Sequence, residues 1–119
     1  MSQLFECTDY NGNISEWDTS NVTNMRNMFA WTQRFDQPIG NWDVSNVTNM
    51  TGMFWNAWEF NQPIGDWNVS NVTDMKKMFE YAYSFNQPIN NWNTNNIDKI
   101  FFDMFYKCPI EEKYKPKFN

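Results

Sequence analysis

Acidic and amide side chains recur at two fixed positions beside a regularly spaced tryptophan. Carboxylates from neighbouring repeats could act as an acid pair or hold a cation. The Asp43 and Asp66 region therefore makes a carboxylate-based hydrolase a distant functional alternative. Because acidic residues are interspersed with Asn in these sets, the pattern favours a solvated face on which charge repulsion is diluted. The set that follows each tryptophan is Asp18, Asp43, Asn68 and Asn93, and the set that precedes it is Glu16, Asn41, Asp66 and Asn91.

Histidine is absent, and the two cysteines lie near opposite ends of the chain. The commonest general base and the commonest metal ligand are therefore missing. Lys107 stands beside Cys108 and could lower the pKa of its thiol, but we favour an inert, buried cysteine. A disulfide between Cys7 and Cys108 is not expected, because stacked repeats would hold them about 15–20 Å apart. We predict no catalytic residues, no metal and no cofactor.

Aromatic side chains occupy the positions that change from one repeat to the next, within residues 30–34, 55–59 and 80–84. A repeat protein keeps its scaffold constant and varies what faces a partner. We predict that these side chains form an exposed strip that binds a protein or a carbohydrate. The alternative is that several are buried between repeats, as tryptophan usually is. The predicted partner-binding residues are Trp31, Trp55, Trp58, Tyr81 and Tyr83.

The elements that must position these residues repeat every 25 residues, as the spacing of Trp17, Trp42, Trp67 and Trp92 shows. A short unit repeated in this way is expected to stack on its copies. The alternation in Ile-x-x-Trp-x-Val predicts a short strand. The spacing in Met-x-x-Met-Phe-x-x-Ala predicts one face of a short helix, and the threonines Thr23, Thr48 and Thr73 stand where N-cap residues would. The chain is thus predicted to be a single α/β repeat domain, residues 1–119.

The two ends depart from the repeat. Residues 1–13 are predicted to be an N-terminal cap, in which Leu4 and Tyr10 are the counterparts of Phe29 and Phe35. The repeat coils are predicted to span residues 14–104, and the last one is one residue longer between its tryptophan and its Met-Phe pair. Residues 105–119 are predicted to be a C-terminal cap and tail. A lid over the core is expected to be made by Phe101, Phe102, Tyr106 and Ile110.

The charge is unevenly distributed around a formal net of −5. Seven lysines lie in residues 76–119, whereas residues 1–75 hold most of the acids. Nucleic acid is not expected as the partner, because phosphate binding needs clustered basic residues. Neither a signal peptide nor a run of apolar residues that could enter a membrane is visible. We therefore expect a cytoplasmic protein or a fragment of an exported one.

The repeats WDVSNVTNMTGMF and WNVSNVTDMKKMF, with the linking FNQPIG, resemble a bacterial surface-protein repeat of the DUF285 type, over about residues 10–108. The chain is more distantly similar to leucine-rich repeats of the BspA type. This resemblance implies a leucine-rich-repeat-like, right-handed α/β solenoid of about four 25-residue coils, each with one short strand and one short helix. It implies a surface or adhesion role, although similar repeats occur in large DNA viruses, and it implies no catalytic residues.

Three functions remain open at this point. A non-catalytic protein-interaction or adhesion-type module fits an extended repeat surface best. The alternative is a structural component of a larger assembly, such as a virion or an intracellular particle. The carboxylate-based hydrolase is the distant alternative, because the acids have no unlike neighbours that would separate their pKa values.

Overall fold

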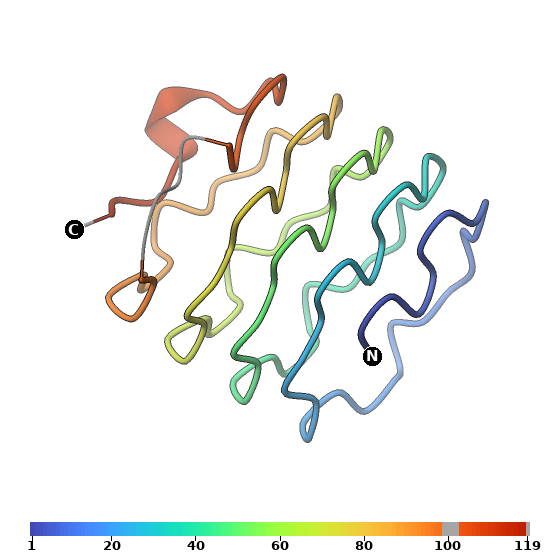
Figure 1. The fold of residues 1–119 in the computed structure, drawn as a ribbon, viewed down its shortest axis with the longest axis horizontal. Helices are drawn as coiled ribbons and strands as arrows, with labels where there is room; N and C mark the ends of the chain where they lie inside the picture. The colour runs from blue at the N-terminus through green and yellow to red at the C-terminus, as the bar shows by residue number, and fades with distance from the viewer. Residues whose placement is uncertain (99–102, 119) are drawn as a thin grey trace.

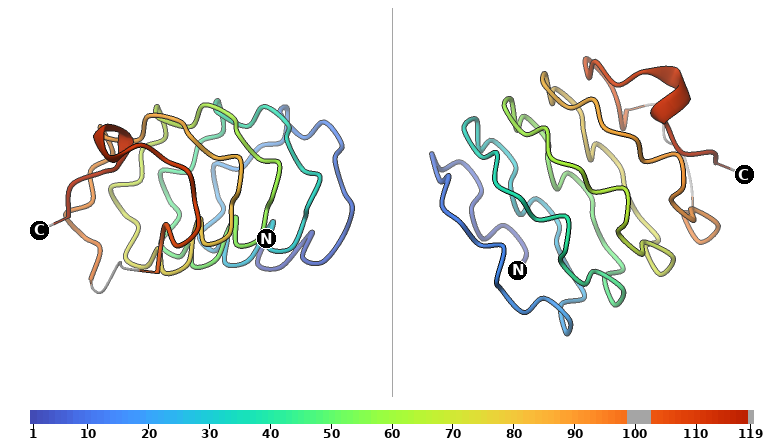
Figure 2. Two further views of the ribbon diagram at one scale, coloured as in Figure 1. Left: turned by 90° about the horizontal axis from the view of Figure 1, so that it is seen from above. Right: turned by 180° about the vertical axis from the view of Figure 1, so that it is seen from behind.

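Successive repeats of the chain lie side by side as a row of similar turns, here called coils (Figure 1). The computed structural model describes residues 1–98 and 103–118. Figure 2 shows from above and from behind that the first and last coils stand at opposite ends of the row. The molecule measures 35 × 31 × 20 Å. No helix among the described residues has the length and apolar character needed to cross a membrane.

The predicted α/β architecture is wrong. In residues 1–98 and 103–118 the only helix is a short 3-10 helix, η1, at Glu112–Tyr114. Parallel β-structure in the same residues is confined to two isolated bridges, Asn24 with Asn49 and Asn49 with Asp74. The chain is therefore not a leucine-rich-repeat-like α/β solenoid with a strand and a helix in each coil. The coils are built almost entirely from turns.

The Met-Phe segments fail to form helices because their amide groups alternate between two kinds of acceptor. In the coil that begins at Met50, the N–H groups of Met53 and Trp55 each donate to the carbonyl three residues earlier, at 3.1 Å. The N–H groups of Gly52 and Phe54 donate instead to the next coil, at 2.8 and 2.9 Å. An α-helix would direct all of them to the carbonyl four residues earlier. Half of the donors are thus used to join coils.

Left-handed backbone conformations make this alternation possible. They recur four residues apart in each Met-Phe segment, and a positive φ interrupts any run of right-handed helix. The residues concerned in the three central coils are Asn27 and Trp31, Gly52 and Asn56, and Lys77 and Tyr81.

The tryptophan segments are likewise turns rather than strands. In the third coil, the N–H of Trp67 donates to the carbonyl of Ile64 at 3.2 Å. The indole Nε1 of Trp67 donates to the carbonyl of Ile39 in the preceding coil at 3.0 Å. The predicted N-cap threonines also join coils, since the N–H of Thr48 donates to the carbonyl of Thr23 at 2.8 Å. Side-chain and main-chain donors together hold the stack.

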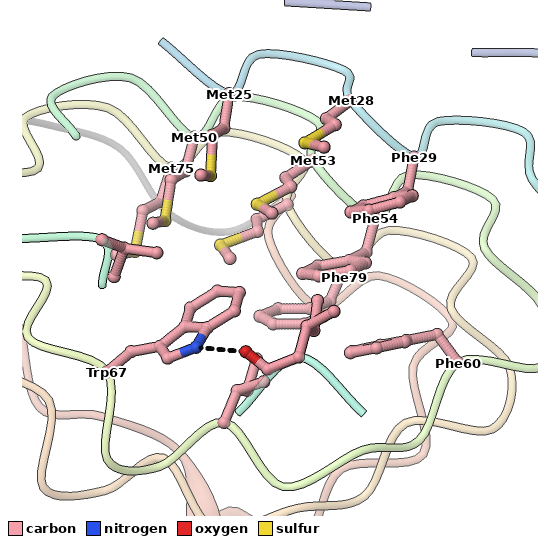
Figure 3. Packing of buried hydrophobic residues seen from close by; sticks show 14 of the residues in the cluster. Met25, Met28, Phe29, Met50, Met53, Phe54, Phe60, Trp67, Met75 and Phe79 are labelled. Carbon is pink, nitrogen blue, oxygen red and sulfur yellow. Dashed lines mark hydrogen bonds between the residues drawn. The ribbon is translucent and has the colours of Figure 1, made fainter. Parts of the chain in front are cut away.

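The core consists of rows in which one residue type repeats from coil to coil (Figure 3). Phe29, Phe54 and Phe79 are fully buried, and their rings stack with centroids 5.6 and 5.5 Å apart. A second phenylalanine in each coil lies against this row, as Phe60 does against Phe54 at 4.1 Å. Two rows of methionine lie on the other side of the phenylalanines, and Trp67 lies below them (Figure 3). Burial of this continuous apolar strip is the main source of stability.

The N-terminal residues extend the stack in a register one residue away from the prediction. Phe5, not Leu4, is the counterpart of Phe29, because the two phenylalanine rings stack at 5.6 Å. Tyr10 stacks on Phe5 at 4.2 Å, as its predicted equivalence to Phe35 requires. The side chain of Leu4 is 49% exposed.

The C-terminal residues also continue the stack. Phe105 stacks on Phe79 at 5.8 Å, which accommodates the extra residue of this coil. The following chain runs beside the preceding coil, and the N–H of Glu111 donates to Oδ1 of Asn86 at 3.0 Å. Of the predicted lid residues, Ile110 is buried, whereas Tyr106 is 50% exposed. The other two, Phe101 and Phe102, lie outside the described residues.

Candidate functional site

Three of the five predicted partner-binding residues are well exposed. The side chains of Trp31, Trp58 and Tyr83 are 41, 40 and 50% exposed. Trp55 and Tyr81 are partly buried. A large aromatic side chain that stays exposed on a protein with an ample core is a candidate contact residue.

Ring contacts connect these residues across coils into two groups, together called the aromatic strip. Trp31 meets the edge of Trp55 on the next coil, with centroids 5.8 Å apart. Trp58 lies 5.8 Å from Tyr83 on the next coil, and Tyr83 lies 6.0 Å from Tyr81. Tyr106, which the partner prediction did not include, adds to the second group, since its ring meets Tyr81 at 5.5 Å. The strip therefore consists of Trp31, Trp55, Trp58, Tyr81, Tyr83 and Tyr106.

The backbone positions two of these rings at a conformational cost. Trp31 and Tyr81 have φ angles of +61° and +60°. The equivalent residue in the intervening coil is Asn56, a type that tolerates this conformation well. A non-glycine residue pays about 1–2 kcal/mol there. The coils thus hold a left-handed site in common, and two of them place a large aromatic residue at it.

Two lysines add positive charge to the strip. Nζ of Lys77 lies 5.1 Å from the ring centroid of Trp55, and Nζ of Lys107 lies 5.7 Å from that of Tyr106. These are cation–π distances. Burial raises the pKa of Glu80, and the nearby charge of Lys77 opposes that shift. The sequence did not indicate that these lysines lie against aromatic rings, although Lys77 stands at a variable position that holds Asn27 and Gly52 in the preceding coils.

Basic residues are confined to one side of the coils in residues 1–98. All Lys and Arg side chains there fall in the Met-Phe half of a coil; they are Arg26, Arg34, Lys76 and Lys77. The tryptophan halves, residues 11–23, 36–48, 61–73 and 86–97, contain no Lys or Arg, and the first three of them contain acids. The strip thus combines aromatic and basic side chains, which are the types enriched at protein interfaces.

The indole of Trp55 carries a buried polar atom without a partner. Its Nε1 makes no hydrogen bond. Its neighbour on the same coil, Trp58, donates its indole N–H to Oδ1 of Asn56 at 3.4 Å. A buried donor of this kind costs about 1–3 kcal/mol, and such groups in native structures call for an explanation.

The Asp and Asn side chains that follow the tryptophans accept hydrogen bonds from the residue two positions later and so stabilise turns. Oδ1 of Asp43 accepts hydrogen bonds from the N–H of Ser45 at 3.0 Å and from its hydroxyl at 2.6 Å. Asn68 accepts the same two bonds from Ser70 at 3.1 and 2.7 Å. The hydroxyl of Ser45 is the main reason why the pKa of Asp43 is lowered. The amide can replace the carboxylate because only an acceptor oxygen is required.

The predicted acid pair is not assembled around a common hollow. A hollow of about 700 Å³ is lined by Asp66 together with Asn41 and Asn91, and Asp43 is not among its lining residues. Within residues 1–98 and 103–118, no group of three or more His, Cys, Asp or Glu side chains could hold a metal ion.

The two cysteines are free and differ in environment. Cys7 is exposed, whereas Cys108 is partly buried and its Sγ lies 3.5 Å from the carbonyl oxygen of Phe85. Burial raises the pKa of the Cys108 thiol to about 11, against smaller opposing effects from the Ile110 N–H and Lys115. The inert thiol favoured from the sequence fits this environment, and the charge of Lys107 does not lower the pKa.

Comparison with protein families gives one match. The family model described as "Mycoplasma protein of unknown function, DUF285" matches residues 1–116. The chain belongs to this family. The DUF285 resemblance inferred from the repeats is therefore confirmed. Comparisons with curated proteins and with solved structures gave no match. Because the DUF285 description assigns no activity, the function is argued from the geometry of the strip.

Proposed function

We propose that this DUF285 protein is a non-catalytic protein-interaction module whose aromatic strip contacts the partner. The observation that carries the proposal is the exposure of Trp31, Trp58 and Tyr83 on neighbouring coils, at 40–50% each. These three aromatic side chains are not buried, although the core contains phenylalanine and tryptophan side chains at other positions. Aromatic side chains of this kind supply most of the affinity at many protein interfaces.

The neighbouring charges support a protein partner with acidic side chains. Lys77 and Lys107 lie over ring faces of the strip, so they offer a cation beside an apolar surface. Such pairs strengthen when the ring and the cation are both removed from water. A carbohydrate partner is the second choice, because the rings meet at steep angles, 61° for Trp31 with Trp55 and 82° for Tyr81 with Tyr106, and make no flat platform.

The other predictions from the sequence remain open. A structural component of a larger assembly stays the alternative function, and cytoplasmic or virion-associated location stays the expected one. The distant relationship to BspA-type repeats also stays a prediction. The hydrolase is not adopted, because Asp66 shares its hollow with amides and not with Asp43.

The proposal is tested by capture of partners from an extract of the native source. The bait is the folded wild-type chain, and the comparison baits carry Trp58→Ala with Tyr83→Ala, or Trp17→Ala. Trp17 is the matched control, since it is 39% exposed but lies off the strip, at the N-terminal end. We expect the double variant to lose a captured protein by about tenfold or more, as for the loss of central aromatic anchors. Equal capture by the wild-type and double-variant baits would show that the strip is not the binding surface.

A further inference from the structure

The tryptophan of the first coil lacks the cover that the tryptophans at the equivalent position of later coils receive. Trp17 is 39% exposed, whereas Trp42, Trp67 and Trp92 at the equivalent position are 5, 3 and 5% exposed. Val22 is likewise only partly buried, although its counterparts in the next two coils are fully buried. An apolar surface is therefore open at this end of the stack.

Two series of coil-to-coil hydrogen bonds also start at this face. The indole N–H groups of Trp42, Trp67 and Trp92 donate to isoleucine carbonyls of the preceding coil, at 3.0, 3.0 and 3.1 Å. The amides of Asn46, Asn71 and Asn96 donate to serine carbonyls of the preceding coil, at 2.7, 2.7 and 2.6 Å. Trp17 and Asn21 stand at the equivalent positions of the first coil. The indole N–H of Trp17 and the side-chain amide of Asn21 are donors that a further segment could use.

The other end of the stack carries a hollow of about 820 Å³. Its lining includes the aromatic rings of Phe105 and Phe118 and the side chains of Lys113, Lys115 and Lys117. Lys113 and Lys115 are paired at the rim with Glu111 at 3.6 Å and with Glu112 at 2.7 Å. The hollow thus combines apolar walls with basic side chains.

The N-terminal end is acidic, whereas the hollow at the other end is lined by three lysines and one acid, Glu112. Residues 1–25 contain Glu6, Asp9, Glu16 and Asp18 and no Lys or Arg. Two of these acids flank Trp17 in the sequence, and both are exposed. The described C-terminal residues 103–118 contain four lysines and three acids. An exposed aromatic side chain with an acidic surround therefore stands at one end, and a basic, aromatic-walled hollow stands at the other.

We propose that copies of this chain associate head to tail, with the Trp17 face of one copy seated in the Phe105–Phe118 hollow of the next. The opposite charges of the ends favour this orientation over contacts between like ends. Because the two contacting surfaces differ, the contact does not close on itself in a dimer, and association continues as an open chain of copies. This surface is separate from the aromatic strip, so it is tested independently of the proposed function.

Sedimentation velocity over a range of protein concentrations tests the association. We expect species larger than the 14.4 kDa monomer that grow with concentration and shrink with added salt, since ends of opposite charge are screened beyond about 10 Å at 0.1 M salt. Trp17→Ala should raise the dissociation constant by about tenfold or more, as expected for an interface anchor. Trp31→Ala is the matched control, because Trp31 is 41% exposed but lies on the strip, and it should leave the association unchanged. Glu16→Lys, which keeps the apolar packing of the end coil, should also weaken it.

Mixing two variants tests the orientation. Trp17→Ala blocks the N-terminal face and leaves the hollow, whereas Lys113→Glu with Lys117→Glu reverses charge at the hollow and leaves Trp17. At a concentration well below their weakened dissociation constants, each variant alone should stay monomeric, and their mixture should form dimers and nothing larger. A wild-type chain that stays monomeric at every concentration would overturn the proposal. So would association that survives both Trp17→Ala and Glu16→Lys, or Trp17→Ala chains that dimerise on their own.

Discussion

The two cysteine side chains, near opposite ends of the stack, lie in different environments. Burial raises the pKa of Cys108 to about 11, whereas Cys7 is exposed. The thiolate is the reactive form of a cysteine. With a pKa of about 11, about one thousandth of the Cys108 side chain is thiolate at pH 8. We expect iodoacetamide to modify Cys7 well before Cys108, and the rate at Cys108 to rise about tenfold per pH unit towards pH 11.

Single-cysteine variants separate the two reactions. In Cys7→Ser, alkylation followed by mass spectrometry reports on Cys108 alone, and in Cys108→Ser it reports on Cys7. The urea-unfolded chain gives the rate of an ordinary thiol for each. If Cys108 in the folded chain reacts at pH 8 as quickly as in the unfolded chain, its buried position is contradicted.

Which aromatic side chains are exposed could be predicted only in part from the sequence. Trp31, Trp58 and Tyr83 at variable positions are exposed, because residues of the constant repeat fill the core. Trp55 and Tyr81 are partly buried, since neighbouring coils lie close enough for rings to pack between them. Burial of this kind depends on the direction of each side chain, and the left-handed backbone at Tyr81 sets that direction.

At the scale of one element, the Met-Phe segment shows why the spacing of apolar residues did not distinguish a helix from turns. Apolar residues at i, i+3, i+4 and i+7 face one side of a helix, but a chain of turns with the same spacing also faces its core. The contrary signals were residues that favour a left-handed backbone: Asn27, Gly52 and Asn56. Their recurrence at the same places in successive repeats could have indicated turns. That half of the amides would join coils could not be read from residue types.

The effect of Gly52→Ala on the free energy of unfolding has opposite signs for the observed turns and for the predicted helix. In a helix, Gly52→Ala would stabilise the protein by about 1 kcal/mol. Here φ is +62°, and an added Cβ would lie 2.1 Å from Oδ1 of Asn27 on the preceding coil. We expect the free energy of unfolding to fall by about 1–2 kcal/mol or more.

Urea denaturation measures the effect of Gly52→Ala, with Asn27→Gly as the paired change. Asn27→Gly removes the obstructing carboxamide and places glycine at another left-handed position, φ +53°. Combined with Gly52→Ala, it should therefore recover part of the lost stability. A gain in stability from Gly52→Ala alone would argue for a helix in this segment.

At the scale of the whole molecule, the 25-residue period predicts which residues are equivalent but not how the ends are completed. The rows of Phe29, Phe54 and Phe79 follow directly from the period. Phe5 joins this row one residue away from its expected place, because the first coil is one residue shorter between its two rings. The register of an end coil depends on how it packs against a single neighbouring coil, and the repeat period does not predict that packing.

The stack also predicts that one substitution has different costs at different coils. Trp67 is 3% exposed, stacks on Trp92 at 6.3 Å and donates its indole N–H to Ile39. Trp67→Ala should lower the free energy of unfolding by about 3–5 kcal/mol, because it leaves a cavity and removes one of the two hydrogen bonds that the Ile39 carbonyl accepts. Trp17→Ala should cost less, since Trp17 is 39% exposed.

Both costs are measured by urea denaturation at protein concentrations where the chain is monomeric, so that association does not add to the stability of the wild type. Trp42→Ala should resemble Trp67→Ala, because Trp42 is 5% exposed and makes the same indole bond to Ile14 at 3.0 Å. Equal costs at Trp17 and Trp67 would mean that the first coil is covered as completely as an interior one. The measurement therefore checks at once the stacking of the coils and the open N-terminal face from which the head-to-tail association was inferred.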